Sequence, residues 1–131
     1  MPDTIELRVR REPTPMVVGD EDDLVEVVGI LLANAMDATV AGGGAGLVEI
    51  ATGLDDRGRA TVWCSDDGVG VPAEDRERVF DPFFTTKDVG EPLGFGLAKT
   101  HRTITAQGGE IVIAARPGGG TIASVGLRTP L

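Results

Sequence analysis

The chain has 131 residues and a formal net charge of −9, from 21 acidic and 12 basic residues. This length provides one hydrophobic core, and the acidic balance argues against nucleic acid or an anionic membrane as the main partner. A single cysteine and a single histidine exclude an internal disulfide, a multi-cysteine metal site and a zinc site with two histidines within this chain.

The first half of the chain predicts a strand, a long helix and then two further strands. Alternating apolar and charged residues open the chain and indicate a half-buried strand. Asp20 then occupies a helix N-cap position, acidic residues fill the first turn, and apolar residues follow at helical spacing. The predicted ranges are, in chain order, 5–10, about 20–41, 47–52 and 60–65.

The second half begins with a glycine-bearing turn and ends in a hairpin. Between them, the sequence predicts a short charged helix, a loop that starts with three phenylalanines, and a second long helix. The order of the elements, with few crossovers, favours an α+β fold: a two-layer sandwich of a mixed, mostly antiparallel sheet with helices on one face. The turn is predicted at 66–72, the short helix at 73–79, the loop at about 80–96, the long helix at about 96–107, and the hairpin strands at 110–115 and 121–127.

Two polar residues lie on one edge of the first helix. On a helical wheel Leu31 marks the centre of the apolar stripe, and Asn34 and Asp37 fall to one side of it. An amide oxygen and a carboxylate one turn apart can hold Mg²⁺ and the phosphates that it carries. The same pair is also typical of a solvated helix edge, so it needs support from elsewhere in the chain.

Two glycine-bearing turns provide that support. Asp66 ends an apolar strand, where a buried carboxylate needs a hydrogen-bond donor such as the exocyclic amine of a nucleobase. The glycines after it let a flat ligand approach the backbone. Gly94-Phe95-Gly96 opens a helix, whose free N–H groups and dipole favour phosphate. Both lysines of the chain, Lys87 and Lys99, flank that turn and would offset an anion there. An ordinary tight turn and a glycine hinge are the structural alternatives.

The motifs become specific when they are taken in order. The blocks are "ILLANAMDA" (30–38), "DDGVG" (66–70), "VFDPFFTTK" (79–87), "GFGLA" (94–98) and "GGGT" (118–121). They resemble the N, G1, F and G2 boxes of the ATP-binding catalytic domain of bacterial sensor histidine kinases. That domain has the Bergerat fold of the GHKL superfamily, shared with gyrase B, Hsp90 and MutL. "NAMDA" with "FDPFFTTK" looks most like the nitrogen-regulation subtype.

This resemblance covers about residues 20–128 and implies one such domain over 1–131, with an ATP lid at about 80–96. It implies that Asn34 ligates Mg²⁺ and, with Lys87, takes part in catalysis. It also implies that Asp66 accepts a hydrogen bond from the adenine amino group, with Thr121 supporting it through water. The remaining implied nucleotide-binding residues are Asp37, Ala38, Gly68, Gly70, Val71, Thr86, Gly94, Phe95, Gly96 and Leu97.

The implied activity is to bind Mg·ATP and to donate its γ-phosphate to a histidine on a separate helical hairpin domain, in the same protein or in trans. A response regulator is then an indirect partner. His101 has no acidic neighbour of the kind that phosphoacceptor histidines usually have, so a structural role is expected for it. The ATP requirement and the lack of a visible targeting segment favour a cytoplasmic location, and the acidic charge favours no nucleic acid and no membrane contact for this domain.

Two positions depart from the kinase pattern. Ile30 replaces a second asparagine, and Pro92 stands where the first glycine of the G2 box is common. The alternative function is therefore a catalytically impaired nucleotide-binding module that docks a partner. Hydrolases of the gyrase or Hsp90 type carry a glutamate base at the position of Ile30, so an ATPase of that type is not expected. The sequence leaves open whether residue 1 is a natural start.

Overall fold

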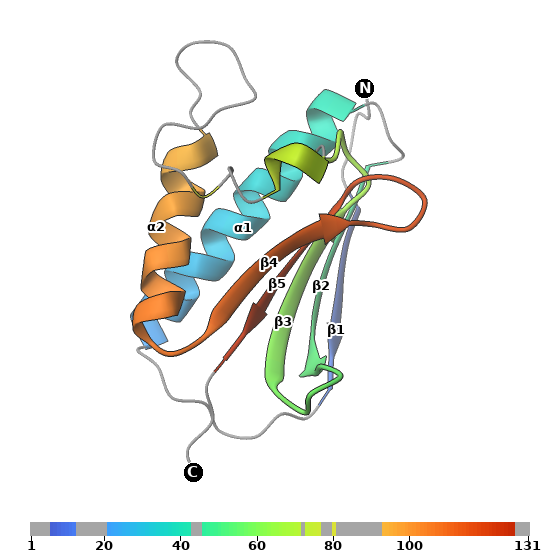
Figure 1. Ribbon diagram of the computed structural model, residues 1–131. Helices are drawn as coiled ribbons and strands as arrows, with labels where there is room; N and C mark the ends of the chain where they lie inside the picture. Colours follow the sequence, from blue (N-terminus) through green and yellow to red (C-terminus); the bar gives the residue numbers. More distant parts are fainter. Residues whose placement is uncertain are drawn as a thin grey trace.

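A computed structural model describes residues 6–12, 21–42, 46–71, 73–76, 80 and 93–127. The described elements form two layers, a five-stranded sheet and a pair of helices that cover one of its faces (Figure 1). The predicted two-layer α+β sandwich is confirmed. In chain order the elements are β1 (Glu6–Arg11), α1 (Glu21–Gly42), β2 (Leu47–Leu54), β3 (Ala60–Asp66), a 3₁₀ turn (Ala73–Asp75), α2 (Leu93–Ala106), β4 (Glu110–Ala115) and β5 (Thr121–Gly126).

The strand order in the sheet is β1-β2-β3-β5-β4, with β1 parallel to β2 and the other neighbours antiparallel. Side chains alternate between the two faces of a strand, so every second residue of the central strands points toward the helices. Val48, Cys64 and Val125 point that way and are nearly inaccessible to solvent. They pack against Leu31 of α1 and Ile104 of α2 in one core cluster.

Strand β1 differs from the prediction. The sequence predicts a half-buried strand over 5–10, but every residue of β1 is exposed, including Leu7 at 51% and Val9 at 58%. The strand lies at the edge of the sheet (Figure 1). Leu7 and Val9 are the register partners of Val48 and Ile50, so they lie on the helical side of the sheet, but α1 and α2 do not bury them.

The helices agree with the prediction more closely. Helix α1 matches the expected 20–41 within one residue, whereas α2 begins at Leu93, ahead of the expected 96. Of the short helix predicted over 73–79, the structure describes a 3₁₀ turn at 73–75, and 77–79 lie outside the described residues. Neither α1 nor α2 is long and apolar enough to cross a membrane.

Candidate functional site

The C-terminal half of α1 provides the first part of the site. Leu31 and Ala35 are buried at 3% and 4% exposure, Asn34 is half-buried and Asp37 is exposed, as the helical wheel predicts. The Asn34 Nδ2 atom is buried and has no hydrogen-bond partner among the described residues. A buried donor without a partner costs about 1–3 kcal/mol, so this amide has unused capacity for a ligand.

The end of β3 provides the second part. Asp66 lies two residues after the core residue Cys64, so its side chain points to the helical side of the sheet, and it is only 5% exposed. Its Oδ1 atom accepts a hydrogen bond from the Gly68 N–H at 2.9 Å. Burial raises the pKa of Asp66 above its ordinary value, and the backbone N–H groups of Gly68 and Thr121 partly oppose this.

A close backbone contact brings these two parts together. The Val69 N–H donates to the carbonyl oxygen of Ala38 at 3.2 Å. A Cβ atom at Gly68 would lie 2.3 Å from the same oxygen, so any other residue there would push the turn away from α1. Because Ala38 follows Asp37 directly, this contact places the Asp66 turn beside the part of α1 that carries Asn34.

The turn between β4 and β5 closes on Asp66 from the other side. Thr121 is paired with Asp66 across the β3–β5 ladder. Gly120 has a φ of 101°, and a Cβ there would lie 1.9 Å from the Asp66 carbonyl oxygen. Sequence reasoning assigns Gly120 no role, although the run of three glycines before Thr121 is the available signal.

The start of α2 is described in part. The backbone of Gly94-Phe95-Gly96 lies in its first turn, and their side chains are outside the described residues. Leu97 is buried at 8% exposure and belongs to the core cluster. The side chain of Leu97 therefore anchors this turn to the core, and the free backbone N–H groups at the start of a helix can bind a phosphate.

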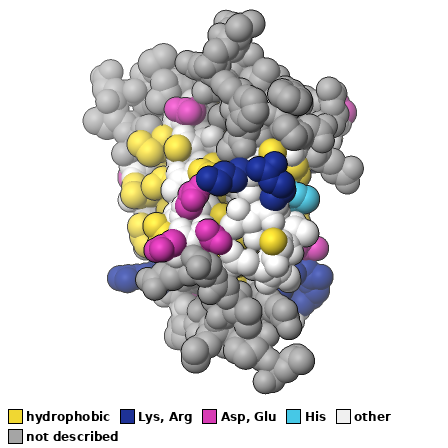
Figure 2. All heavy atoms as spheres, turned by 90° about the vertical axis from the view of Figure 1, so that its left-hand side faces the viewer, with side chains coloured by type: hydrophobic (Ala, Val, Ile, Leu, Met, Phe, Trp, Pro, Cys, Tyr) yellow, Lys and Arg dark blue, Asp and Glu magenta, His cyan; other side chains and the backbone are white. Residues whose placement is uncertain are grey.

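One of the two lysines expected around this turn, Lys99, is described. Lys99 forms an ion pair with Glu26, which lies two turns before Asn34 on α1. The sequence predicts that Lys99 offsets an anion at the glycine turn, and in the structure its side chain shares its charge with Glu26 at the surface. Figure 2, which faces the side that carries α2, shows Lys and Arg side chains running across this face beside acidic ones.

Phe80 lies where the predicted lid begins. It is half-buried, packs against the core cluster and stacks on His101 with ring centroids 4.9 Å apart. This confirms that Phe80 fixes the base of the loop, and it gives His101 the structural contact expected of it. Phe83, Phe84, Thr86, Lys87 and Pro92 lie outside the described residues.

The described site fits an adenine nucleotide better than a metal bound by protein alone. Asp66 offers an acceptor at the end of a strand, Val71 is half-buried beside the turn, and Asn34 offers an unsatisfied amide. The described residues contain no group of three or more His, Cys, Asp or Glu side chains able to hold a metal. Mg²⁺ usually keeps several waters and binds through substrate phosphates with one or two protein ligands. The Asn34 amide oxygen suits such an ion, whereas the unpartnered Nδ2 atom can only donate, for example to a phosphate oxygen.

Cys64 offers no chemistry to this site. The thiol is buried next to Asp66, and desolvation, with a smaller contribution from the Asp66 charge, raises its pKa to about 11. A thiol with this pKa stays protonated at neutral pH and is a poor nucleophile.

Comparison with known proteins agrees with this geometry. The Pseudomonas aeruginosa two-component sensor PprA is 36% identical over 126 residues, which are 91% of this chain and 13% of PprA. The Escherichia coli K12 sensor histidine kinase ZraS is 32% identical over 118 residues, which are 89% of this chain and 24% of ZraS. The chain therefore spans about a quarter or less of these curated relatives.

Solved structures give the same result. The catalytic domain of histidine kinase ThkA matches with a TM-score of 0.79 and 28% identity, over 95% of this chain and 79% of that chain. Full-length ShkA in complex with AMPPNP matches with a TM-score of 0.77 and 28% identity, over 94% of this chain and 25% of that chain.

The resemblance to histidine kinase catalytic domains is thus confirmed, while the nitrogen-regulation subtype stays a prediction. The family of histidine kinase-, DNA gyrase B- and HSP90-like ATPases matches residues 19–131, nearly the whole chain. The chain therefore belongs to this ATPase family.

Proposed function

We propose that this chain is a histidine kinase catalytic domain that binds Mg·ATP between α1, the end of β3 and the start of α2. In this proposal it donates the γ-phosphate to a histidine on a separate helical hairpin domain. The observation that carries the proposal is the buried Asp66 carboxylate, held beside the Asn34 turn of α1 by the Gly68 contact. The AMPPNP complex of the similar ShkA supports an adenine nucleotide as the ligand.

Each described residue then has a role that its position supports. Asp66 accepts from the adenine amino group, with Thr121 beside it, while Gly68 and Gly70 keep the backbone close to the base. Asn34 holds the metal or a phosphate oxygen, with Asp37 and Ala38 on the same stretch of α1. Bound Mg²⁺ would neutralise phosphate charge, and the protein would contribute position and charge stabilisation.

The remaining site residues stay proposals from the family pattern. We assign the lid to about 80–96, phosphate contacts to Thr86 and Lys87, and backbone contacts to residues 94–97. We also propose that 1–131 forms a single domain that works in the cytoplasm, where ATP is available. A phosphoacceptor domain, and indirectly a response regulator, would be its partners.

Ile30 favours a second candidate function. It is half-buried on α1, one turn before Asn34, and its side chain has no atom that can ligate Mg²⁺. A domain with one metal ligand fewer can bind nucleotide yet transfer phosphate poorly. Such a domain would be a nucleotide-binding regulatory module whose occupied state docks a partner.

Transfer of labelled phosphate from ATP to a supplied histidine hairpin domain separates the two functions. The kinase proposal expects the wild-type chain to phosphorylate the hairpin histidine, and Ile30→Asn to raise the rate by a modest factor. Transfer by Ile30→Asn alone would assign the wild type to the regulatory module. A hairpin whose histidine is replaced by alanine is the control for non-specific labelling.

A further inference from the structure

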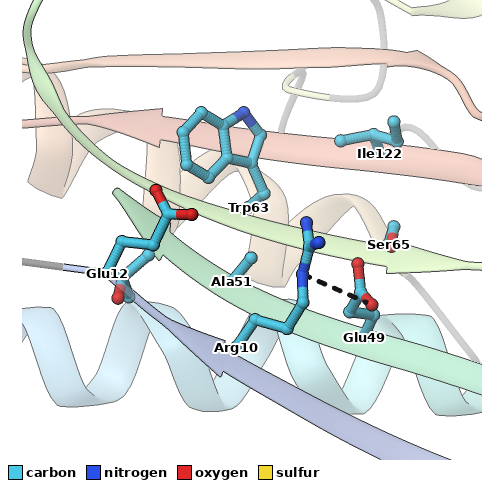
Figure 3. A pocket seen from close by; sticks show the side chains of 8 residues that line it. Arg10, Glu12, Glu49, Ala51, Trp63, Ser65 and Ile122 are labelled. Carbon is cyan, nitrogen blue, oxygen red and sulfur yellow. Dashed lines mark ion pairs between the residues drawn. The ribbon is translucent and has the colours of Figure 1, made fainter. Parts of the chain in front are cut away.

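The sheet has a hollow on the face that the helices leave open. It has a volume of about 340 Å³, and β1, β2, β3 and β5 all contribute to it (Figure 3). The residues that matter for its chemistry are Arg10, Glu12, Glu49, Trp63, Ser65 and Ile122. Ser65 and Trp63 alternate with the core residue Cys64 along β3, so this hollow lies on the sheet face opposite the Asp66 side chain.

Gly53 allows an indole and a carboxylate to meet in this hollow. A Cβ atom at Gly53 would lie 3.1 Å from Glu12 Oε2 and 3.5 Å from Trp63 Cζ3. The Glu12 carboxylate and the Trp63 ring therefore converge over a residue that has no side chain. Figure 3 shows the Glu12 carboxylate directed toward the indole, with Arg10 rising between Glu12 and Glu49.

The charges of the hollow favour a cation. Two carboxylates face a single guanidinium, and no Lys or Arg of the described residues pairs with Glu12. Among the described residues Arg10 pairs only with Glu49, at 3.8 Å, and its side chain is 71% exposed, so this ion pair is weak. Arg10 makes no cation–π contact with Trp63 within the described part of the chain. Within the described residues, therefore, no cation occupies the indole face or the Glu12 carboxylate.

We propose that the open-face hollow is a docking site for an arginine side chain carried by a segment of a partner protein. The guanidinium stacks on Trp63 and pairs with Glu12, while Ala51 and Ile122 receive its aliphatic stem. Arginine suits the site better than lysine because its planar group can stack and pair at once. The net charge of −9 attracts such a segment at long range.

Intrinsic fluorescence tests this directly, because Trp63 is the only tryptophan and the chain has no tyrosine. Acetylated tri-arginine amide is the probe, and tri-citrulline amide is its uncharged match in shape. Tri-arginine should change the Trp63 emission saturably, tri-lysine should bind more weakly, and tri-citrulline should have no effect. The apparent affinity should fall as salt is added.

Two variants in the hollow and one control variant outside it localise the binding. Glu12→Gln should weaken tri-arginine binding about threefold to fivefold, since it removes the counter-ion beside the indole. Asp22→Asn removes the same charge from the exposed start of α1, on the other layer, and should change the affinity less than about twofold. Trp63→Leu, followed by calorimetry, should abolish saturable binding. Both Glu12→Gln and Trp63→Leu should still bind ATP, which shows that they fold and separates this site from the nucleotide site.

The proposal fails if tri-arginine leaves the Trp63 emission unchanged at low salt, or if tri-citrulline acts as well as tri-arginine. It also fails if Glu12→Gln and Asp22→Asn weaken binding equally, because the peptide would then respond to overall charge alone.

Discussion

Replacing Gly68 by alanine tests how the site is assembled. The new Cβ would lie 2.3 Å from the Ala38 carbonyl oxygen and 2.7 Å from the Thr39 nitrogen, whereas real Cβ contacts essentially never fall below 3.0 Å. The turn and α1 must therefore move apart by roughly 0.7 Å, and both obstacles are backbone atoms that cannot rotate away.

The cost follows from that movement. Overpacking against backbone, with loss of the Val69–Ala38 hydrogen bond, should destabilise the domain by about 2–4 kcal/mol. For a chain of this size that corresponds to a fall of about 8–15 °C in Tm. Because the shift also displaces Asp66 relative to Asn34, ATP affinity should fall even at temperatures where the variant is folded.

Gly29→Ala is the matched control. Gly29 is exposed on α1, and a Cβ added there would meet no atom within 4 Å, so alanine should stabilise the helix by about 0.5–1 kcal/mol. Thermal unfolding followed by circular dichroism and ATP titration by calorimetry measure both effects. This assembly of the site is refuted if Gly68→Ala melts with the wild type and binds ATP with unchanged affinity.

Three further changes test other parts of the structure. Gly120→Ala should destabilise the domain far more than Gly118→Ala. Both glycines have a positive φ, but only a Cβ at Gly120 meets backbone, 1.9 Å from the Asp66 carbonyl oxygen. Equal melting temperatures of the two variants would argue against this contact. Asp66→Asn should resist urea better than the wild type near neutral pH. Because the pKa of Asp66 is raised in the folded state, Asp66 stabilises the fold fully only below the ordinary carboxyl pKa of about 4, and this stabilisation is lost as the pH rises. The stability difference between Asp66→Asn and the wild type should therefore shrink in acid. A difference that grows in acid would contradict a raised pKa for Asp66. Ile104→Ala should cost about 2–5 kcal/mol in urea unfolding because Ile104 is fully buried, whereas exposed Thr105→Ala should change stability by less than about 0.5 kcal/mol.

Local pattern predicts much of this fold. The apolar repeat and the glycines after it predict α1 to within a residue, and the predicted strand 110–115 agrees with β4 at both ends. The motif order also places Asn34 and Asp66 at one site, and the structure brings Ala38, one turn after Asn34, into contact with Gly68, two residues after Asp66.

The features that sequence reasoning misses depend on contacts between distant parts of the chain. The alternation of apolar and charged residues in β1 predicts which residues share a face of the strand. It does not predict whether the helices reach the edge of the sheet, so it does not reveal the exposure of Leu7 and Val9. The pairing of Lys99 with Glu26 joins two helices and has no local signal. The hollow around Trp63 is likewise formed by four strands from both ends of the chain.

Calorimetric titration of ATP, with and without Mg²⁺, into the wild type, Asp66→Asn and Asp56→Asn tests the central claim most directly. Asn at position 66 keeps the acceptor for Gly68 but turns a donor toward the adenine amino group, so binding should weaken about 30- to 150-fold or disappear. Asp56 is an exposed turn residue, and the same substitution there should leave binding unchanged. Wild-type binding should strengthen with Mg²⁺. ATP binding that is equally tight in Asp66→Asn, or its absence from the wild type, would contradict the account.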